Sequence, residues 1–279
     1  MIDTHIHLLD PDRFTYAWTA GFPALAGRFD HSDYQSMAHG LGIGGGVFME
    51  VDCGEMAEEA RHFCALAETP GCIFQSVVAA ARPEHEGFEK YLDAIAHPRL
   101  AGIRRVLHTQ ADDLSRSDLF RRHVGLLGRR GLSFDLCVAE HQLPIAFELA
   151  VACPDTQFIL DHCGCPSIAS HGDASLLESW KKNLRLLGEL PHVAVKLSGI
   201  TAYASPAQRH ALALRPYFET LMESFGPDRI LWGGDWPVVN LGDGLPAWIA
   251  ITRELVADLT EHDREKILTA TARRIYRLP

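Results

Sequence analysis

Long apolar runs and an excess of positive charge are both missing from this sequence of 279 residues. No stretch approaches the roughly 18 apolar residues that a membrane-spanning helix needs. Acidic residues outnumber basic ones by 36 to 26, which gives a formal net charge of -10. A surface of that sign repels phosphate backbones and anionic lipids. The sequence therefore predicts neither a membrane partner nor a nucleic-acid partner.

A pattern of paired cysteines and the features of a signal peptide are also missing. The seven cysteines include no CxxC pair, and only Cys163 and Cys165 lie close together in the sequence. This usage is typical of reduced thiols in a cytosolic protein and not of a disulfide framework. The segment Met1–His7 has neither the basic region nor the apolar stretch of a signal peptide. We therefore expect a cytoplasmic globular protein, and a homo-oligomer is compatible with this composition.

The sequence does contain an alternation of short apolar runs with longer segments of helical periodicity. The short runs are Ile2–Ile6, Gly45–Val51, Ile73–Ala80, Gly102–Leu107, Leu132–Val138, Phe158–Leu160, Val193–Leu197 and Ile230–Trp232. Each is expected to be a strand buried on both faces. The helical segments are Glu55–Leu66, Glu86–Ala96, Asp118–Arg130, Leu143–Ala152, Leu176–Leu190, Pro206–Phe225, Leu245–Leu259 and Glu261–Ile275. This pattern predicts an α/β fold, a (β/α)₈ TIM barrel that forms a single domain over residues 1–279.

A doubly wound open sheet is the competing architecture. It usually has a glycine-rich phosphate loop after its first strand, but the sequence there reads His-Ile-His-Leu-Leu-Asp. The barrel is therefore the expected fold. The segment Pro11–Asp33 is longer than an ordinary strand-to-helix connection and rich in aromatic residues. We expect it to be a binding loop, an aromatic plug over the barrel rim, or both.

Two histidines end the first predicted strand. Strand alternation puts the side chains of His5 and His7 on the same side, with Ile6 pointing the other way. The motif alone is weak, because about 0.8 HxH pairs are expected by chance in a chain with this many histidines. Its position favours function, since active sites of barrels lie at the carboxyl ends of the strands.

Two further polar residues follow the sixth and eighth strands. His162 lies where the sixth strand must turn into a loop, in Leu160-Asp-His-Cys-Gly164. Asp235 lies between two glycines and Trp236-Pro237 after the eighth strand, which directs its carboxylate toward the barrel mouth. We expect His5, His7, His162 and Asp235 to converge there.

These residues resemble the amidohydrolase superfamily. The pieces Ala101-Gly-Ile-Arg-Arg105, Phe134-Asp-Leu-Cys137, Leu160-Asp-His-Cys-Gly164 and Gly234-Asp-Trp-Pro237 are similar to its amidohydrolase-2 branch, and most similar to lactonases of sugar lactones and pyrone dicarboxylate lactones. The resemblance runs from the first strand to the eighth. It implies catalytic roles for His5, His7, His162 and Asp235, with Asp235 taking a proton from water.

The resemblance also bears on metal content. Binuclear members bridge two metals with a carbamylated lysine after the fourth strand, but here that end reads Arg104-Arg-Val-Leu-His108, without lysine. A binuclear centre is therefore not expected. The set His5, His7, His162 and Asp235 suits a single zinc ion. Similar lactonases can work without metal, so the resemblance implies that no cofactor is strictly required.

Substrate-binding candidates come from the same strand ends. Arg104 matches the arginine of the family's GIR motif, and it either binds substrate or forms an ion pair on the barrel wall. His108 lies on the same side of that segment. Glu50, after the second strand, could hydrogen-bond a sugar hydroxyl. Trp236 and Tyr16 could stack on a sugar ring, although aromatics at a barrel rim more often pack.

Three enzymatic hypotheses share this site. The first is hydrolysis of a small, sugar-derived lactone by water. The second is a zinc-dependent non-oxidative decarboxylase, and the third is a lactone isomerase that moves a proton with the same base. A barrel that only binds a ligand is disfavoured, because four converging titratable groups are costly to maintain without chemistry.

Overall fold

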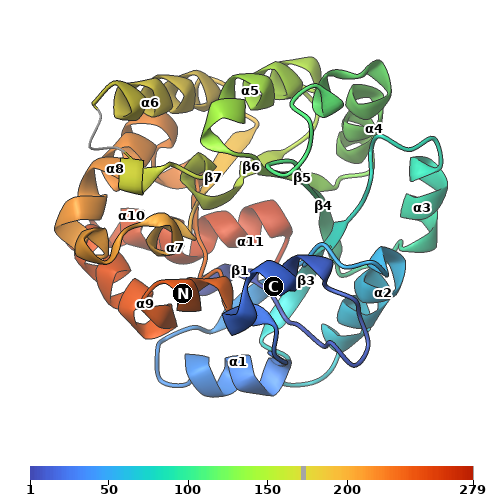
Figure 1. Ribbon diagram of the computed structural model, residues 1–279, viewed down its shortest axis with the longest axis horizontal. Helices are drawn as coiled ribbons and strands as arrows, with labels where there is room; N and C mark the ends of the chain where they lie inside the picture. The colour runs from blue at the N-terminus through green and yellow to red at the C-terminus, as the bar shows by residue number, and fades with distance from the viewer. Residues whose placement is uncertain (171–173, 279) are drawn as a thin grey trace.

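The computed structural model describes residues 1–170 and 174–278 and shows the expected barrel (Figure 1). Eight strands pair in parallel in the order of the sequence, from β1 to β8. Their bounds are β1 Ile2–Ile6, β2 Gly45–Met49, β3 Phe74–Ala80, β4 Leu100–Val106, β5 Ser133–Cys137, β6 Phe158–Leu160, β7 Val193–Leu197 and β8 Ile230–Trp232. Each predicted strand is present, with ends that differ by at most two residues. The (β/α)₈ prediction is confirmed.

Helices surround the strands (Figure 1). They are α1 His31–Ala38, α2 Met56–Leu66, α3 Phe88–Ala94, α4 Asp118–Arg129, α5 Leu143–Ala152, α6 Ala174–Gly188, α7 Ile200–Tyr203, α8 Ala211–Phe225, α9 Gly244–Leu255, α10 Glu261–Glu265 and α11 Thr271–Tyr276. No helix in the described part of the chain is long and apolar enough to cross a membrane.

The sequence prediction missed α1 and α7 and misjudged two helical segments. The segment Pro206–Phe225 begins its helix only at Ala211, because a separate 3₁₀ turn comes first and the His210 side chain caps α8. The segment Glu261–Ile275 is α10, a π-helical turn and α11, and not one α-helix. A signal for α1 was present in the sequence, because Asp30 and Asp33 form a reciprocal capping box.

The sheet closes between its first and last strands. Ile6 pairs with Trp236 beyond the end of β8, and the Thr4 hydroxyl donates to the Trp232 carbonyl at 2.7 Å. Inside the barrel, an apolar cluster contains one or two residues from most strands, for example Ile2, Ile159 and Leu231. Tyr276 of α11 packs against that cluster. The inner apolar core therefore supports a separate, polar set of side chains, which is described below.

The long segment after β1 is largely a packed plug. Phe14 and Tyr16 are buried, and the Trp18 indole donates to the Val51 carbonyl at 2.8 Å. The ring of Phe22 is instead 47% exposed. Of the two roles expected for this segment, the structure shows the packing role directly.

Candidate functional site

The four predicted strand-end residues lie together, and all are buried. The Nε2 atoms of His5 and His7 are 3.2 Å apart, and the ring centroids of His5 and His162 are 4.4 Å apart. Asp235 Oδ1 lies 3.7 Å from His5 Nε2 and 3.5 Å from His7 Nε2. Its other oxygen lies 3.9 Å from His162 Nδ1. The expected convergence is therefore present in the structure.

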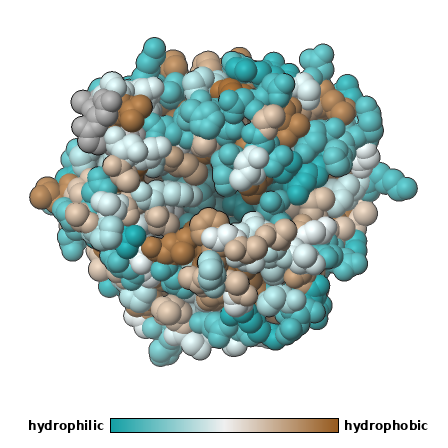
Figure 2. Space-filling view, viewed as in Figure 1, coloured by the Kyte–Doolittle hydropathy of each residue, from teal (hydrophilic) through white to brown (hydrophobic). Residues whose placement is uncertain are grey.

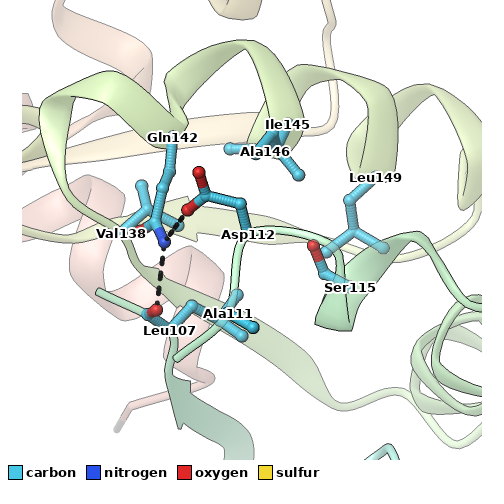
Figure 3. A pocket seen from close by; sticks show the side chains of 9 residues that line it. All are labelled: Leu107, Ala111, Asp112, Ser115, Val138, Gln142, Ile145, Ala146 and Leu149. Carbon is cyan, nitrogen blue, oxygen red and sulfur yellow. Dashed lines mark hydrogen bonds between the residues drawn. The ribbon is translucent and has the colours of Figure 1, made fainter. Parts of the chain in front are cut away.

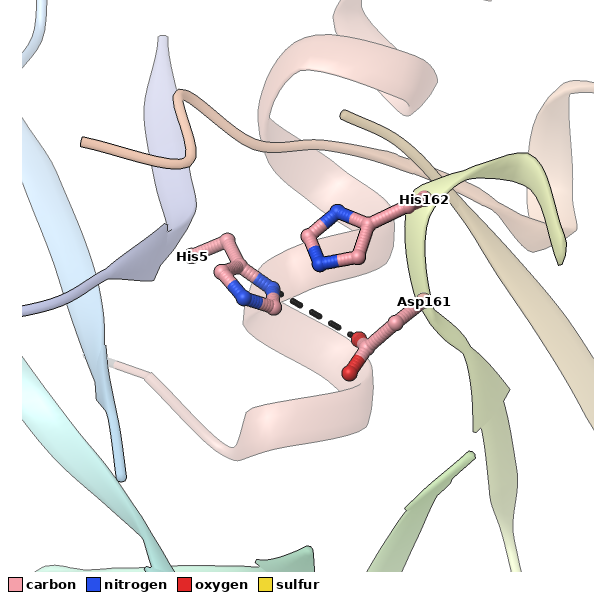
Figure 4. Close-up of side chains that lie close together, drawn as sticks. All are labelled: His5, Asp161 and His162. Atoms are coloured by element: carbon pink, nitrogen blue, oxygen red, sulfur yellow. Dashed lines mark ion pairs between the residues drawn. The ribbon is translucent and has the colours of Figure 1, made fainter. Parts of the chain in front are cut away.

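His162 and Asp235 have left-handed backbone conformations, which orient their side chains toward the cluster. Ile159 belongs to the inner core, so regular alternation along β6 would point Asp161 inward and His162 outward. His162 has a φ of 52°, and this turn brings its ring to the cluster (Figure 4). Asp235 has a φ of 56°. Non-glycine residues rarely adopt this region, and strain of this kind tends to gather at functional sites.

Gly199 leaves the space that the cluster needs. Its φ is 66°, and a Cβ at this position would lie 2.5 Å from His162 Nδ1 and 3.0 Å from Asp235 Oδ2. No side chain fits there without displacing both groups. His162 Nδ1 instead hydrogen-bonds the Ser198 hydroxyl at 3.0 Å.

Asp235 presents an unpaired carboxylate. It is 1% exposed, and neither of its oxygens has a hydrogen-bond partner among the described residues. A buried carboxylate without donors is costly, so this group is suited to a cation, a water molecule or a substrate hydroxyl.

Burial favours the neutral form of two imidazoles of the cluster, His5 and His162. Burial is the largest cause that lowers the pKa of His5 well below its ordinary value, with the Lys196 charge acting in the same direction. Burial also lowers the pKa of His162. His7 Nδ1 lies 3.0 Å from the Met49 carbonyl, which can only accept a hydrogen bond. In neutral His7 the proton is therefore on Nδ1, and the lone pair of Nε2 faces the cluster.

The geometry fits a single zinc ion on three of the four predicted ligands. Two ligands on one tetrahedral zinc lie about 3.3 Å apart when each bond is about 2.0 Å. The triangle of His5 Nε2, His7 Nε2 and Asp235 Oδ1 has edges of 3.2, 3.5 and 3.7 Å. His162 falls instead in a second candidate group, with His5 and Asp161. His162, the fourth ligand of the predicted set, is therefore not part of the triangle formed by the other three.

Electrostatics favours the first group over the second for a cation. Asp161 is already neutralised by Lys196 Nζ at 2.9 Å and by the Arg104 guanidinium at 3.5 Å. Those cations lower the attraction of the second group for a metal ion. No cationic side chain lies within ion-pair distance of Asp235 among the described residues other than the imidazoles themselves. A divalent ion would therefore take the triangle that contains Asp235.

Three charged residues beneath this cluster are not among the predicted site residues. Lys196 Nζ contacts Asp135 Oδ1 at 2.6 Å and Asp161 Oδ1 at 2.9 Å, and all three side chains are fully buried. The Tyr276 hydroxyl donates to Asp135 at 2.6 Å.

The buried charges around the cluster do not balance. Four carboxylates (Glu50, Asp135, Asp161 and Asp235) face two cations (Arg104 and Lys196). When all are ionised, two negative charges are in excess, and burial raises the pKa of Asp135. One zinc ion would carry the compensating charge. Without zinc, a proton taken up by Asp135 or by an imidazole would lower the excess.

Arg104 and Glu50 form an ion pair on the inner wall. Arg104 Nε donates to Glu50 Oε1 at 2.5 Å, and a terminal nitrogen donates to the Glu50 carbonyl at 2.7 Å. The Asp52 amide donates to the other Glu50 oxygen at 2.6 Å. The remaining terminal nitrogen of Arg104 lies 3.3 Å from His5 Nε2. Of the two alternatives for Arg104, the ion pair is observed, and one nitrogen still faces the cluster.

Glu59, on α2, provides a test of burial in this region. It is fully buried, and burial raises its pKa to about 8, with the Glu50 carboxylate acting in the same direction. The unfolded chain loses this proton near its ordinary pKa, so folding loses stability as pH rises from about 4.5 to about 8. We expect Glu59→Gln to be more stable than the wild type by about 3 kcal/mol at pH 7. Urea unfolding at pH 5 and pH 7 checks this, and equal pH dependence of the two proteins would contradict it.

The other substrate candidates lie in different surroundings. His108 is exposed at the mouth, with Nδ1 3.2 Å from the Cys137 sulfur. Trp236 is 3% exposed and packs edge to face against Phe29 and Tyr34. The buried Tyr16 hydroxyl accepts from the Asp10 amide. The structure gives these two aromatic residues packing partners, and we propose no substrate contact for them.

Asp3 is a second buried carboxylate that sequence reasoning missed. It connects β1 to the backbone that follows β8, where the barrel closes. Asp3 Oδ1 accepts from the His5 and Gly234 amides at 3.0 and 2.7 Å, and Tyr34 donates to Oδ2. Burial raises the pKa of Asp3 to about 6. A Cβ on Gly234 would lie 2.3 Å from Asp3 Oδ2. Asp3 thus ties the His5 backbone to the backbone that precedes Asp235.

A cavity of about 620 Å³ opens beside the cluster. Its lining residues are His108, Ala139, Glu140, His141, Pro144, Cys165, Ser167, Leu176, Ser179, Asn183 and Tyr203. The ring of Tyr203, which lines this cavity, lies 6.2 Å from that of His162, between centroids, so Tyr203 stands between the cavity and the cluster. Figure 2 shows this face of the molecule hollowed near its centre. The volume suits a ligand of one small ring with substituents.

A smaller cavity between the β4 loop and α5 has no such capacity (Figure 3). Its volume is about 10 Å³, which is at most the space for one water molecule. Gln142 crosses it and donates to the Leu107 carbonyl and the Asp112 carboxylate. This cavity is a small packing gap between the loop after β4 and α5, and it is too small to bind a substrate.

Comparison with known proteins identifies the family. The family model described as Amidohydrolase matches residues 2–278. The chain belongs to the amidohydrolase family. This amidohydrolase is 27% identical to an L-fucono-1,5-lactonase of Burkholderia multivorans, over 100% of this chain and 96% of that protein. It is 26% identical to a 4-sulfomuconolactone hydrolase of Rhizobium radiobacter, over 84% of this chain and 75% of that protein.

A solved amidohydrolase from Burkholderia multivorans has the same fold. It covers 100% of this chain and 99% of its own in two crystal forms, one with bound HEPES and one with bound zinc. The TM-scores are 0.91 and 0.90, at 26% and 25% identity. With its lactonase relatives, this likeness makes the amidohydrolase an enzyme that hydrolyses ester bonds.

Proposed function

We propose that this amidohydrolase opens a small, sugar-derived 1,4- or 1,5-lactone by attack of water on the ester carbonyl, with Asp235 as the general base. The observation that supports this most is the buried Asp235 carboxylate, which lacks hydrogen-bond donors and is surrounded by three imidazoles. A base in this position can hold a water molecule and take its proton as the water attacks.

The remaining groups orient the lactone. The rings of His5 and His162 and the Arg104 nitrogen that faces the cluster can hydrogen-bond the carbonyl oxygen, on which negative charge develops. Collapse of the tetrahedral intermediate breaks the ring C–O bond, and the proton held by Asp235 passes to the leaving alkoxide. The product is a hydroxy acid, and the base is restored. A zinc ion bound by His5, His7 and Asp235 would polarise the carbonyl as a Lewis acid.

The charge of the cavity favours a neutral substrate. The described residues that line it include no Arg or Lys, while His108, His141, Ser167 and Asn183 offer polar contacts. A dicarboxylate or sulfonated lactone requires cations to compensate its charge. Hydroxyl groups of a sugar lactone need only hydrogen-bond donors and acceptors. His108 and Arg104 are the proposed substrate contacts, and Glu50 acts through Arg104.

A screen of lactones tests this function. We expect pH-indicator assays to detect hydrolysis of neutral aldonolactones, with kcat/KM at least about 100-fold above that for pyrone dicarboxylate, since one unpaired buried charge costs several kcal/mol. The matched control is heat-denatured protein, because lactones hydrolyse spontaneously. A preference for the dicarboxylate would contradict the neutral substrate class, and isomerised lactone without acid release would indicate the isomerase.

A further inference from the structure

Tyr203 ends α7 and stands between the cluster and the large cavity. Its side chain is 38% exposed and lines the cavity, and its ring lies 6.2 Å from that of His162, between centroids. The sequence analysis did not single out this residue, because it follows β7 only after a turn and a short helix. A ligand that reaches from the cavity to the cluster lies against Tyr203.

The position of Tyr203 is fixed by the segment that precedes it. Directly after β7, the Ser198 hydroxyl lies 3.0 Å from His162 Nδ1. The first residue of α7, Ile200, is fully buried. The short helix is therefore anchored in the barrel next to His162, and it presents the phenol of its last residue at the edge of the cavity.

The hydroxyl of Tyr203 lacks a strong hydrogen-bond partner. Among the described residues, its one such contact is the Cys165 thiol at 3.9 Å, and a thiol is a weak donor and a weak acceptor. Asp235 is not its acceptor, because neither oxygen of that carboxylate has a hydrogen-bond partner in the described part of the chain. A tyrosine hydroxyl carries its proton at neutral pH. Tyr203 therefore has a hydrogen bond to donate to a ligand.

We propose that Tyr203 is a specificity-determining residue, which donates a hydrogen bond to the hydroxyl group on the carbon next to the lactone carbonyl. The inference rests on the proposed function, because it takes a lactone as the substrate. With the carbonyl carbon at the cluster, the ring oxygen faces Asp235, from which it receives a proton. The other ring neighbour, C2, then points away from Asp235, and the rest of the ring extends past Tyr203 into the cavity. The substrate class is thereby narrowed to lactones with a 2-hydroxyl group.

Tyr203→Phe tests this contact, because it removes the hydroxyl and keeps the ring. With a 2-hydroxy aldonolactone we expect kcat/KM to fall about 3–10-fold, mainly through KM, since one neutral hydrogen bond is lost from ground state and transition state alike. With the matching 2-deoxy lactone, kcat/KM should stay within about twofold of the wild type, since that substrate makes no such bond. Equal losses on both lactones would overturn the proposal, because the phenol would then act on the ring oxygen or on the fold.

Tyr16→Phe is the matched control variant. It removes a buried phenol whose oxygen accepts from the Asp10 amide and which does not line the large cavity. We expect it to keep the wild-type preference for the 2-hydroxy lactone. Loss of that preference in Tyr16→Phe to the same extent as in Tyr203→Phe would contradict a specific contact at Tyr203.

Binding of lactams, in which N–H replaces the ring oxygen, separates this inference from lactone hydrolysis. In titration calorimetry we expect the wild type to bind a 2-hydroxy sugar lactam about 3–10-fold more tightly than its 2-deoxy counterpart, and Tyr203→Phe to bind both alike. If the wild type shows this preference but hydrolyses no lactone, the proposed reaction fails and the role of Tyr203 stands. Absence of lactam binding to the wild type, or an unchanged preference in Tyr203→Phe, would overturn the proposal whatever the lactone screen shows.

Discussion

Replacement of Asp235 by asparagine is expected to lower kcat for lactone hydrolysis by about 10²–10⁴-fold, the usual contribution of a general base. The amide has nearly the same shape as the carboxylate, but it cannot take a proton from water. Orientation of the lactone by His5 and His162 remains, so the loss should appear mainly in kcat and not in KM.

The fold should tolerate this change. The Asp235 oxygens accept no hydrogen bond from the described residues, so the amide breaks none. Asparagine also adopts the left-handed backbone found at this position, with a φ of 56°, as readily as aspartate. The matched control is Asp243→Asn, an exposed carboxylate that pairs with Arg209 and should keep full activity. Activity of Asp235→Asn within about threefold of the wild type would show that another group takes the proton.

Replacement of Lys196 by methionine is expected to lower the free energy of unfolding by about 3–5 kcal/mol. The ammonium is the cation closest to both Asp135 and Asp161, and all three groups are fully buried. Its removal leaves two carboxylates in a site of low dielectric, with Arg104 3.5 Å from Asp161. Methionine fills a similar volume, so the loss reports charge and not a cavity.

Lys181→Met is the matched control. Its ammonium pairs with Glu178 at 2.8 Å on the exposed face of α6, where ion pairs contribute little. We expect this variant to lie within about 0.5 kcal/mol of the wild type in urea unfolding. A loss of similar size in both variants would mean that the internal network does not stabilise the barrel more than a surface pair.

The sequence predicted the barrel because short apolar runs buried on both faces admit few arrangements. It predicted His5, His7 and Asp235 because strand ends in a parallel barrel meet at one mouth. Alternation along the sixth strand also predicts an inward side chain for Asp161, but of these two neighbours only His162 was predicted as a site residue. Only the left-handed backbone at His162 brings both residues inside.

The sequence indicates that charged residues are buried in the strands, but it does not show which charges pair with each other. Lys196 is the charged residue of β7 and Asp135 that of β5, and a charge in a strand buried on both faces requires a partner. Which partner it finds depends on the register across β5, β6 and β7, which is set by packing over long sequence distances. For that reason Arg104 was expected as a substrate contact or an ion pair, and only the structure shows that Glu50 is its partner.

The most direct test of the account is turnover of a neutral sugar lactone by protein stripped of metal. We predict that hydrolysis persists with less than about 0.1 zinc per chain, because Asp235 and the histidines provide the base and the orienting contacts themselves. Loss of all activity on chelation and its return with zinc would contradict this result. The zinc-dependent decarboxylase, or a zinc hydrolase, would then be the better account of the site.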